Sequence, residues 1–277
     1  MSDLEITRDG HVATITLNRP ASSNALGPVF WKSFADELAE LDLAGEIRVL
    51  ILRGEGRHFC AGMDLMAFAA GGATTTETPA EREAFFHAAR YVQSVIAAVE
   101  RVRFPVIAAI QGACLGAGLE LISACNLRFA SSEAYFAIEE SNTGMMADLG
   151  SLQRLPTQMP QALVHEMAFM GTRISAERAH QAGFLNALAE DEEALLLMAT
   201  EAAHNIAAKA PLALAGTKAA LTFSRDHSVP SSLEYAAVLQ AAIWNTPDIM
   251  AAMHAKSNKT DGEFAELAAI RTLRDRG

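Results

Sequence analysis

Three carboxylates in the middle of the chain are the strongest candidates for chemistry. Glu120, Glu140 and Asp148 stand among apolar and small residues. Crowded carboxylates in an apolar pocket raise one another's pKa, which suits them to general acid and base catalysis near neutral pH. A helix leading out from Glu120 and short strands leading back would return Glu140 to its level. The turn at 141–144 would then bring Asp148 close.

Simpler roles are open for the same carboxylates. Glu120 in the first turn of a helix would balance the helix dipole, and Asp148 could be only an N-cap. Glu139 and Glu140 end a strand, so one must face away from the other, and a solvated edge would explain both. Carboxylates could also bind a metal, but no histidine supports them. We therefore expect no metal site.

A glycine turn after a strand is the second candidate. Residues 112–118, GACLGAG, match the GxxxGxG pattern of short-chain dehydrogenases. The mid-chain position argues against a dinucleotide site, and no tyrosine is followed by a lysine four residues later. The glycines could simply let a helix pack tightly on a sheet. Alternatively, the unpaired N–H groups that open the helix, at the turn Gly116-Ala117-Gly118, could hold an oxyanion without any side chain.

A second backbone donor is expected in the segment FCAGMDL, residues 59–65, which follows a strand and an RGEGR turn. Here the exposed N–H would be that of Met63. Two donors from separate loops make an oxyanion hole, and each such donor typically contributes about 10²–10³ in rate. The simpler interpretation is a strand-to-helix connection with Asp64 as the helix cap. Nucleophilic hydrolysis has little support, because the chain contains neither GxSxG nor HExxH.

Composition limits the remaining classes of function. The 277 residues are 51% hydrophobic and 20% charged, with a net charge of −11 and no cluster of Lys and Arg. We therefore expect a globular protein that binds no nucleic acid. Three cysteines without a CxxC pair favour a reducing compartment, and the charged start MSDLEITRDG does not resemble a signal peptide. A cytoplasmic location is the expectation.

The apolar stretch 104–125 is as long as a membrane span, yet it carries Gln111, Glu120 and three glycines. A buried strand, a glycine turn and a buried helix explain it better, so no membrane partner is expected. The wider pattern alternates strands and helices and predicts an α/β core over 1–190. The predicted strands are 4–8, 12–17, 48–53, 106–110, 127–130 and 134–138, with helices from 28 to about 43, from 81 to 102 and from 118.

Two segments stand apart from this core. Residues 69–80, AAGGATTTETPA, are small and polar and predict a mobile loop. Residues 191–277 are expected to form a helical region, with predicted helices at 191–209, 212–224, 231–244 and 247–257 that run nearly to the end. These helices are apolar enough to need a partner surface, so self-association is expected.

Taken together, these segments resemble the crotonase, or enoyl-CoA hydratase/isomerase, superfamily. The resemblance runs through 18–26, 58–65, 105–131, 134–140, 150–156 and 171–186. It implies a spiral of ββα units closed by a C-terminal helical trimerisation region, often as a dimer of trimers. It also implies an acyl-CoA thioester substrate whose enolate is stabilised by two backbone N–H groups. Coenzyme A then arrives as part of the substrate, and no cofactor is permanently bound.

The resemblance assigns roles to residues of this chain. The two N–H groups correspond to Met63 and Ala117; the family usually has glycine at the second position, and the methyl group is expected to narrow the pocket. The resemblance also implies substrate or CoA contacts at Asn24, Ala25, Ala61, Gly62, Asp64, Leu65, Gly116 and Gly118. Because CoA carries phosphates and the chain is acidic, local basic residues must serve the nucleotide, with Lys32, Arg53 and Arg57 as candidates.

The carboxylates distinguish members of the family. Glu120 and Glu140 match the two glutamates of the hydratases, whereas Asp148 within 143–156, TGMMADLGSLQRLP, resembles the 3,5-dienoyl-CoA to 2,4-dienoyl-CoA isomerases. The long segment between 63 and 105 points the same way. Glu120 departs from that subgroup, which typically has aspartate there. We therefore expect Glu140 or Asp148 to remove the C2 proton and the other to protonate C6, with Glu120 orienting or tuning Glu140.

Two other functions remain open. A 2-enoyl-CoA hydratase would use Glu120 and Glu140, and a catalytically silent acyl-CoA-binding protein could share the fold. A further hypothesis is that 69–80 closes over the acyl chain.

Overall fold

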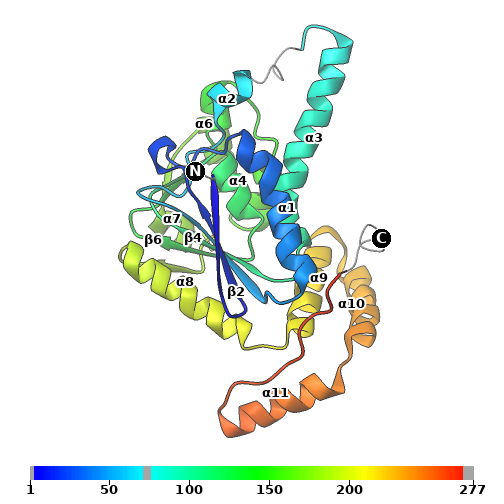
Figure 1. The fold of residues 1–277 in the computed structure, drawn as a ribbon. Helices are drawn as coiled ribbons and strands as arrows, with labels where there is room; N and C mark the ends of the chain where they lie inside the picture. The colour runs from blue at the N-terminus through cyan, green and yellow to red at the C-terminus, as the bar shows by residue number, and fades with distance from the viewer. Residues whose placement is uncertain (1–2, 71–75, 271–277) are drawn as a thin grey trace.

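The centre of the computed structural model, which describes residues 3–70 and 76–270, is a twisted six-stranded sheet (Figure 1). Its spatial order is β1-β2-β3-β4-β6-β9, and all pairs are parallel except the β1–β2 hairpin. The strands are β1 (Leu4–Asp9), β2 (Val12–Leu17), β3 (Val49–Gly54), β4 (Val106–Ile110), β6 (Leu127–Ser131) and β9 (Ala187–Ala189). A smaller sheet contains β5 (Ala113–Leu115), β7 (Tyr135–Ala137) and β8 (Ile174–Ser175).

Alternation along the central strands creates two apolar layers, because successive side chains point to opposite faces. On β3, Leu50 and Leu52 join the large core, and Val49 and Ile51 join a second cluster on the other face. The large core receives α1 (Pro28–Ala44), α3 (Pro79–Arg101) and α4 (Ala117–Ser123). The second face is covered by α8 (Glu192–Ala207), which runs along the sheet in Figure 1.

Local sequence signals set the ends of α1 and α3. Pro28 opens α1, and Gly45 at φ 77° ends it in the left-handed conformation that glycine adopts freely. For α3 the opening is a capping box, in which Thr78 and Glu81 each bond the other's backbone N–H. The buried residues of α3 begin at Val92, so its first turns extend beyond the body of the protein (Figure 1).

Further short helices connect strands of the two sheets. They are α2 (Leu65–Ala70), α5 (Ser151–Arg154), α6 (Gln161–Met170) and α7 (Ala176–Gln181), with 3₁₀ turns at Pro20–Ser22, Glu140–Thr143 and Leu155–Thr157. The last helices are α9 (Pro211–Asp226), α10 (Val229–Ile243) and α11 (Thr246–Asn258), which lie away from the sheet in Figure 1. Although α10 is rich in apolar residues, all of its side chains are at least partly exposed.

The α/β class and the helical C-terminal region are confirmed, except that residues 259–270 of the region expected to be helical form no helix. Several boundaries also need correction. The strand expected at 134–138 is shorter, and the helix expected from 81 begins at Pro79. Of the expected loop 69–80, residues 69–70 belong to α2 and 71–75 lie outside the described residues. The stretch 104–125 is a strand, a glycine turn and a helix as expected, but it also contains β5. None of the described helices has the length and apolarity needed to cross a membrane.

Candidate active site

One cavity of about 320 Å³ brings the three carboxylates together with the two expected backbone donors. Glu120, Glu140 and Asp148 line it, and so do Met63 and Ala117. The remaining lining residues are apolar: Leu65, Phe85, Ala89, Val92, Met145, Met146 and Leu149. The cavity therefore combines an apolar wall with a small number of convergent polar groups, as substrate sites do.

Glu120 is the most deeply buried of the three carboxylates, with 1% of its surface exposed. Its Oε1 accepts hydrogen bonds from Leu149 N at 2.9 Å, Ser151 N at 3.4 Å and Ser151 Oγ at 3.1 Å. Oε2 is buried and has no hydrogen-bond partner among the described residues. Burial, followed by the charge of Glu140, raises the pKa of Glu120 from 4.5 to about 7 despite these hydrogen bonds.

Glu140 points into the cavity while its neighbour points away, which settles the orientation that the sequence left open. Glu139 forms an ion pair with Arg173 at 3.2 Å. Burial raises the pKa of Glu140, and the charge of Asp148 adds to the shift. Gly116, at φ 49°, leaves room for Glu140, because a Cβ there would lie 3.0 Å from Oε1.

Asp148 lies in a turn between Gly144 and α5 that is held by α3 and by Glu120 of α4. Gln93 of α3 donates to the Asp148 carbonyl at 2.8 Å, and the next residue, Leu149, donates to Glu120. Burial raises the pKa of the Asp148 carboxyl. All three carboxylates line the cavity and have raised pKa values, and Glu120 also accepts hydrogen bonds from the turn. Such groups can accept and donate protons near neutral pH.

Met63 and Ala117 meet at the cavity through their backbones. A parallel β-bridge joins Leu26 to Met63. In this bridge the Leu26 N–H donates to the Gly62 carbonyl, and the Asp64 N–H donates to the Leu26 carbonyl. The N–H of Met63 therefore points away from Leu26. Ala117 is the first residue of α4, where an N–H has no partner within the helix. A Cβ on Gly62 would lie 3.8 Å from Ala117 N, so the two segments are in contact. Neither N–H has an acceptor among the described residues.

The other residues expected at the substrate lie along the same two loops. Residues 23–26 run beside 61–64 through bonds such as Ala61 N to the Ser23 carbonyl at 2.9 Å. The side chain of Asn24 is 2% exposed and bonds three backbone groups, so it shapes the loop. Asp64 caps α2 through Ala67 N and pairs with Arg19 at 3.0 Å, which is the simpler role expected for it.

The other residues that were expected to contact the substrate or the nucleotide have different surroundings. Gly118 lets α4 approach a neighbouring loop, because a Cβ there would lie 2.7 Å from Cβ of Cys60. Arg53 pairs with Glu55 and Glu192, at 3.4 and 3.5 Å, and Lys32 and Arg57 are exposed. All three cysteines are buried and free. Residues 3–70 and 76–270 contain no cluster of three or more His, Cys, Asp or Glu arranged to hold a metal ion.

Apart from Leu65, which was expected at the substrate, the apolar wall was not predicted, although part of it had a signal. Phe85, Ala89 and Val92 are spaced by four and three residues, so they share one face of α3. Met145 and Met146 lie in an irregular segment where no period could have indicated them.

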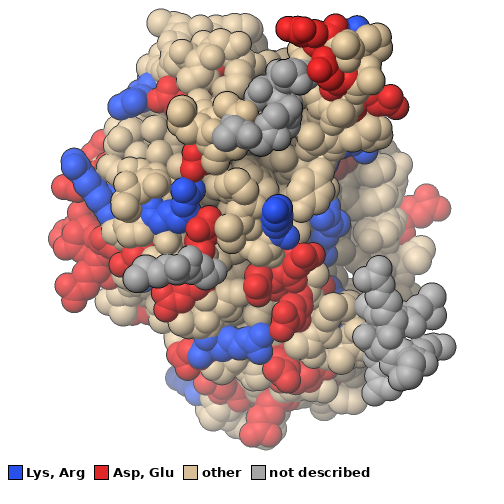
Figure 2. Space-filling model, turned by 45° about the horizontal axis from the view of Figure 1, so that its top comes forward, with Lys and Arg blue, Asp and Glu red and all other residues tan. Residues whose placement is uncertain are grey.

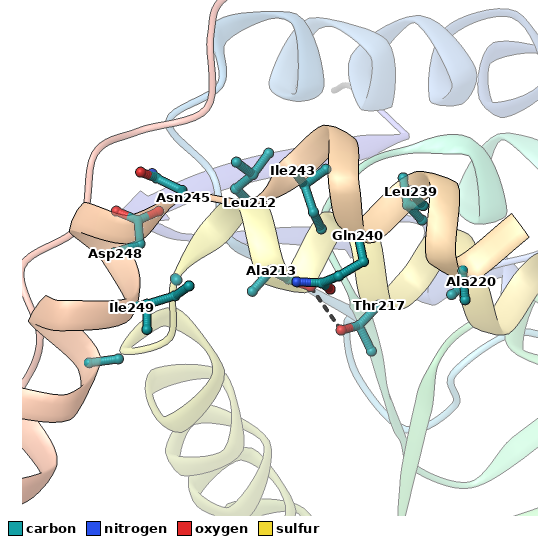
Figure 3. Close-up of a pocket in the computed structure, with 14 residues that line it drawn as sticks. Leu212, Ala213, Thr217, Ala220, Leu239, Gln240, Ile243, Asn245, Asp248 and Ile249 are labelled. Carbon is teal, nitrogen blue, oxygen red and sulfur yellow. Dashed lines mark hydrogen bonds between the residues drawn. The ribbon is translucent and has the colours of Figure 1, made fainter. Parts of the chain in front are cut away.

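A second cavity of about 320 Å³ lies between α9, α10 and α11 (Figure 3). Its wall includes Leu212, Ile243 and Ile249, and Asp248 is the one carboxylate among the described residues that line it. This cavity lacks the paired acids of the first.

In the face shown in Figure 2, the described Lys and Arg side chains are interspersed with Asp and Glu and form no continuous basic patch.

Comparison with known proteins identifies the family. The sequence profile described as enoyl-CoA hydratase/isomerase matches residues 7–266. The chain belongs to the enoyl-CoA hydratase/isomerase family. It is 37% identical to the peroxisomal Delta(3,5)-Delta(2,4)-dienoyl-CoA isomerase of Arabidopsis thaliana, over 95% of this chain and 97% of that protein. The mitochondrial isomerase of the same name from Mus musculus is 35% identical, over 91% of this chain and 78% of that protein.

Solved structures of the enoyl-CoA hydratase/isomerase family agree with this fold. A crystal structure of an enoyl-CoA hydratase from Polaromonas sp. JS666 has a TM-score of 0.84 and 29% sequence identity, and the match covers 95% of this chain and 99% of that one. The crotonase-like α/β fold expected from the resemblance is therefore confirmed. As a member of this family, the chain is an enzyme of acyl-CoA metabolism.

Proposed function

We propose that this protein isomerises 3,5-dienoyl-CoA to 2,4-dienoyl-CoA. The observation that carries the proposal is the presence of Asp148 in the same cavity as Glu140 and Glu120. A hydratase needs two acids close together to deliver one water, whereas this isomerisation moves protons at two distant carbons. Two separated carboxylates suit the second task better. The names of the relatives support the same assignment.

In the proposed reaction, the thioester oxygen lies between the N–H groups of Met63 and Ala117. These groups stabilise the negative charge that develops when the C2–H bond breaks. Glu140 or Asp148 takes the C2 proton, and the electron pair moves through the dienolate to C6. The other acid then protonates C6, so no proton is gained or lost overall. The raised pKa values of both carboxylates favour proton transfer near neutral pH.

Glu120 has a supporting role in this proposal. Its Oε1 accepts from the amides of Leu149 and Ser151, so it holds the turn that carries Asp148. The charge of Glu140 helps to raise the pKa of Glu120, so the two carboxyl groups titrate as interacting neighbours. CoA is part of the substrate in this scheme and no permanent cofactor is needed.

The oligomeric state is also part of the proposal. Large apolar side chains of the C-terminal helices are exposed, including Val229, Leu233, Val238 and Trp244 at 64% or more. Exposed apolar surface of this kind is typical of an interface. We propose a trimer or a dimer of trimers, which sedimentation can test. A cytoplasmic location stays a prediction, since the two compared isomerases are named as peroxisomal and mitochondrial.

A substrate panel tests the proposed reaction. Spectrophotometric assays with 2-enoyl, 3-enoyl and 3,5-dienoyl thioesters should show the highest kcat/KM for the dienoyl substrate. In Asp148→Gly, dienoyl isomerisation should be lost while any hydration of 2-enoyl-CoA is spared. Preferential hydration by the unchanged protein, or equal loss of both activities in the variant, would contradict the proposal. Tight acyl-CoA binding without turnover of any member would indicate a binding protein instead.

A further inference from the structure

The turn that carries Asp148 is held from outside the cavity by an arginine. Arg154, in α5, donates from Nη1 to the Leu149 carbonyl at 3.3 Å. The backbone N–H of Leu149 donates to Glu120 Oε1 at 2.9 Å. Leu149 is therefore held by Arg154 through its carbonyl and by Glu120 through its N–H. Because Asp148 is the preceding residue, these bonds restrict the backbone that positions its carboxyl.

Gly150 shows how closely the guanidinium lies on this turn. Its φ is 132°, and a Cβ there would lie 1.7 Å from Arg154 Nη1. A side chain at this position would therefore displace the guanidinium. The glycine is required both by its backbone conformation and by the arginine that covers it.

The guanidinium of Arg154 is itself fixed by a carboxylate of α3. Its Nε and Nη2 bond the two oxygens of Glu100 at 3.0 and 2.9 Å, and the two side chains are 12% and 14% exposed. Arg225 of α9 also bonds Glu100. Burial alone would raise the pKa of Glu100, but the hydrogen bonds and charges of both arginines hold it below its usual value. Bidentate salt bridges of this kind fix the orientation of both side chains.

We propose that Arg154 is a positioning residue for Asp148, and that Glu100 and Arg225 hold its guanidinium in place. This proposal rests on the proposed isomerase function. Arg154 does not line the cavity, so it acts on the reaction through the turn at 148–151. Because Arg225 belongs to α9, the placement of the C-terminal helices also affects the site.

The test is a conservative variant. Lysine in Arg154→Lys keeps the positive charge but cannot bond both oxygens of Glu100 and the Leu149 carbonyl together. Its kcat for 3,5-dienoyl-CoA should fall at least about tenfold with little change in KM, since misplacement of a reacting group slows the chemical step. Hydrogen exchange of the amides in 148–153, followed by mass spectrometry, should become faster. The matched control is Arg178→Lys, which alters an exposed two-point pair with Glu166 and should change neither quantity.

The two readouts separate the two proposals. If the unchanged protein does not isomerise dienoyl-CoA, the proposed function fails, and the exchange rates still show whether Arg154 holds the turn. Unchanged exchange and unchanged kcat in Arg154→Lys would overturn the positioning role. If that variant does not fold, Glu100→Gln replaces it, because it leaves Arg154 in place and weakens its attachment. Slow exchange and full kcat in Glu100→Gln would likewise overturn the proposal.

Discussion

The substitution Glu120→Gln should change how stability depends on pH. Burial, with the charge of Glu140, raises the pKa of Glu120 from 4.5 to about 7. The folded protein therefore holds this proton more tightly than the unfolded chain does. Its contribution to stability is present below pH 4.5 and is lost as the pH rises through 7. At 1.36 kcal/mol for each pH unit, that interval corresponds to about 3 kcal/mol.

Urea unfolding at a fixed protein concentration measures this effect. Between about pH 4.5 and pH 8, the free energy of unfolding of Glu120→Gln should increase by about 3 kcal/mol relative to the unchanged protein. Glutamine keeps the oxygen that accepts from Leu149 and Ser151 but never ionises. Glu166→Gln is the control, because hydrogen bonding to Arg178 lowers the pKa of that carboxyl, the opposite direction from the shift at Glu120. A constant difference between Glu120→Gln and the unchanged protein would refute the reasoning.

Three further substitutions test other parts of the site. Ser151→Ala removes a hydroxyl that donates to Glu120 Oε1 at 3.1 Å, so the pKa of Glu120 should rise. The pH at which the stability from this group is lost should then increase, and an unchanged pH would contradict this. Gly116→Ala places a methyl group 3.0 Å from Glu140 Oε1 at φ 49°. It should lower the free energy of unfolding by about 1–3 kcal/mol, measured in urea, and slow isomerisation. Ala89→Phe fills the cavity from α3, so KM should rise more for long acyl chains than for short ones, and a uniform change would count against this wall.

The sequence predicted the placement of the acids because regular elements connect them. A helix beginning near Glu120 and short strands returning to Glu140 allow little freedom, and the structure brings both into one cavity with Asp148. The bridge between 26 and 63 was not predicted, and neither was β5. Three residues within a glycine-rich turn give no usable alternation, so pairing with β7 decides that they form a strand.

The support around the acids could not be predicted for a different reason. Glu100 and Arg154 are 54 residues apart, and no local pattern relates them. Similarly, the face of α3 that carries Phe85 and Ala89 has helical spacing, but spacing does not distinguish a core face from a cavity wall. Only the packing of α3 against α1 and α4 determines which turns stay open to the cavity.

The central claim is that two carboxylates move two protons, and solvent isotope exchange tests it most directly. Dienoyl-CoA is incubated in D₂O with Glu140→Gln or Asp148→Asn, and deuterium at C2 and C6 is followed by NMR. Both variants should fail to form the 2,4-dienoyl product, and one of them should still exchange the C2 proton because its C2 base is intact. Isomerisation at the unchanged rate in either variant would contradict the account.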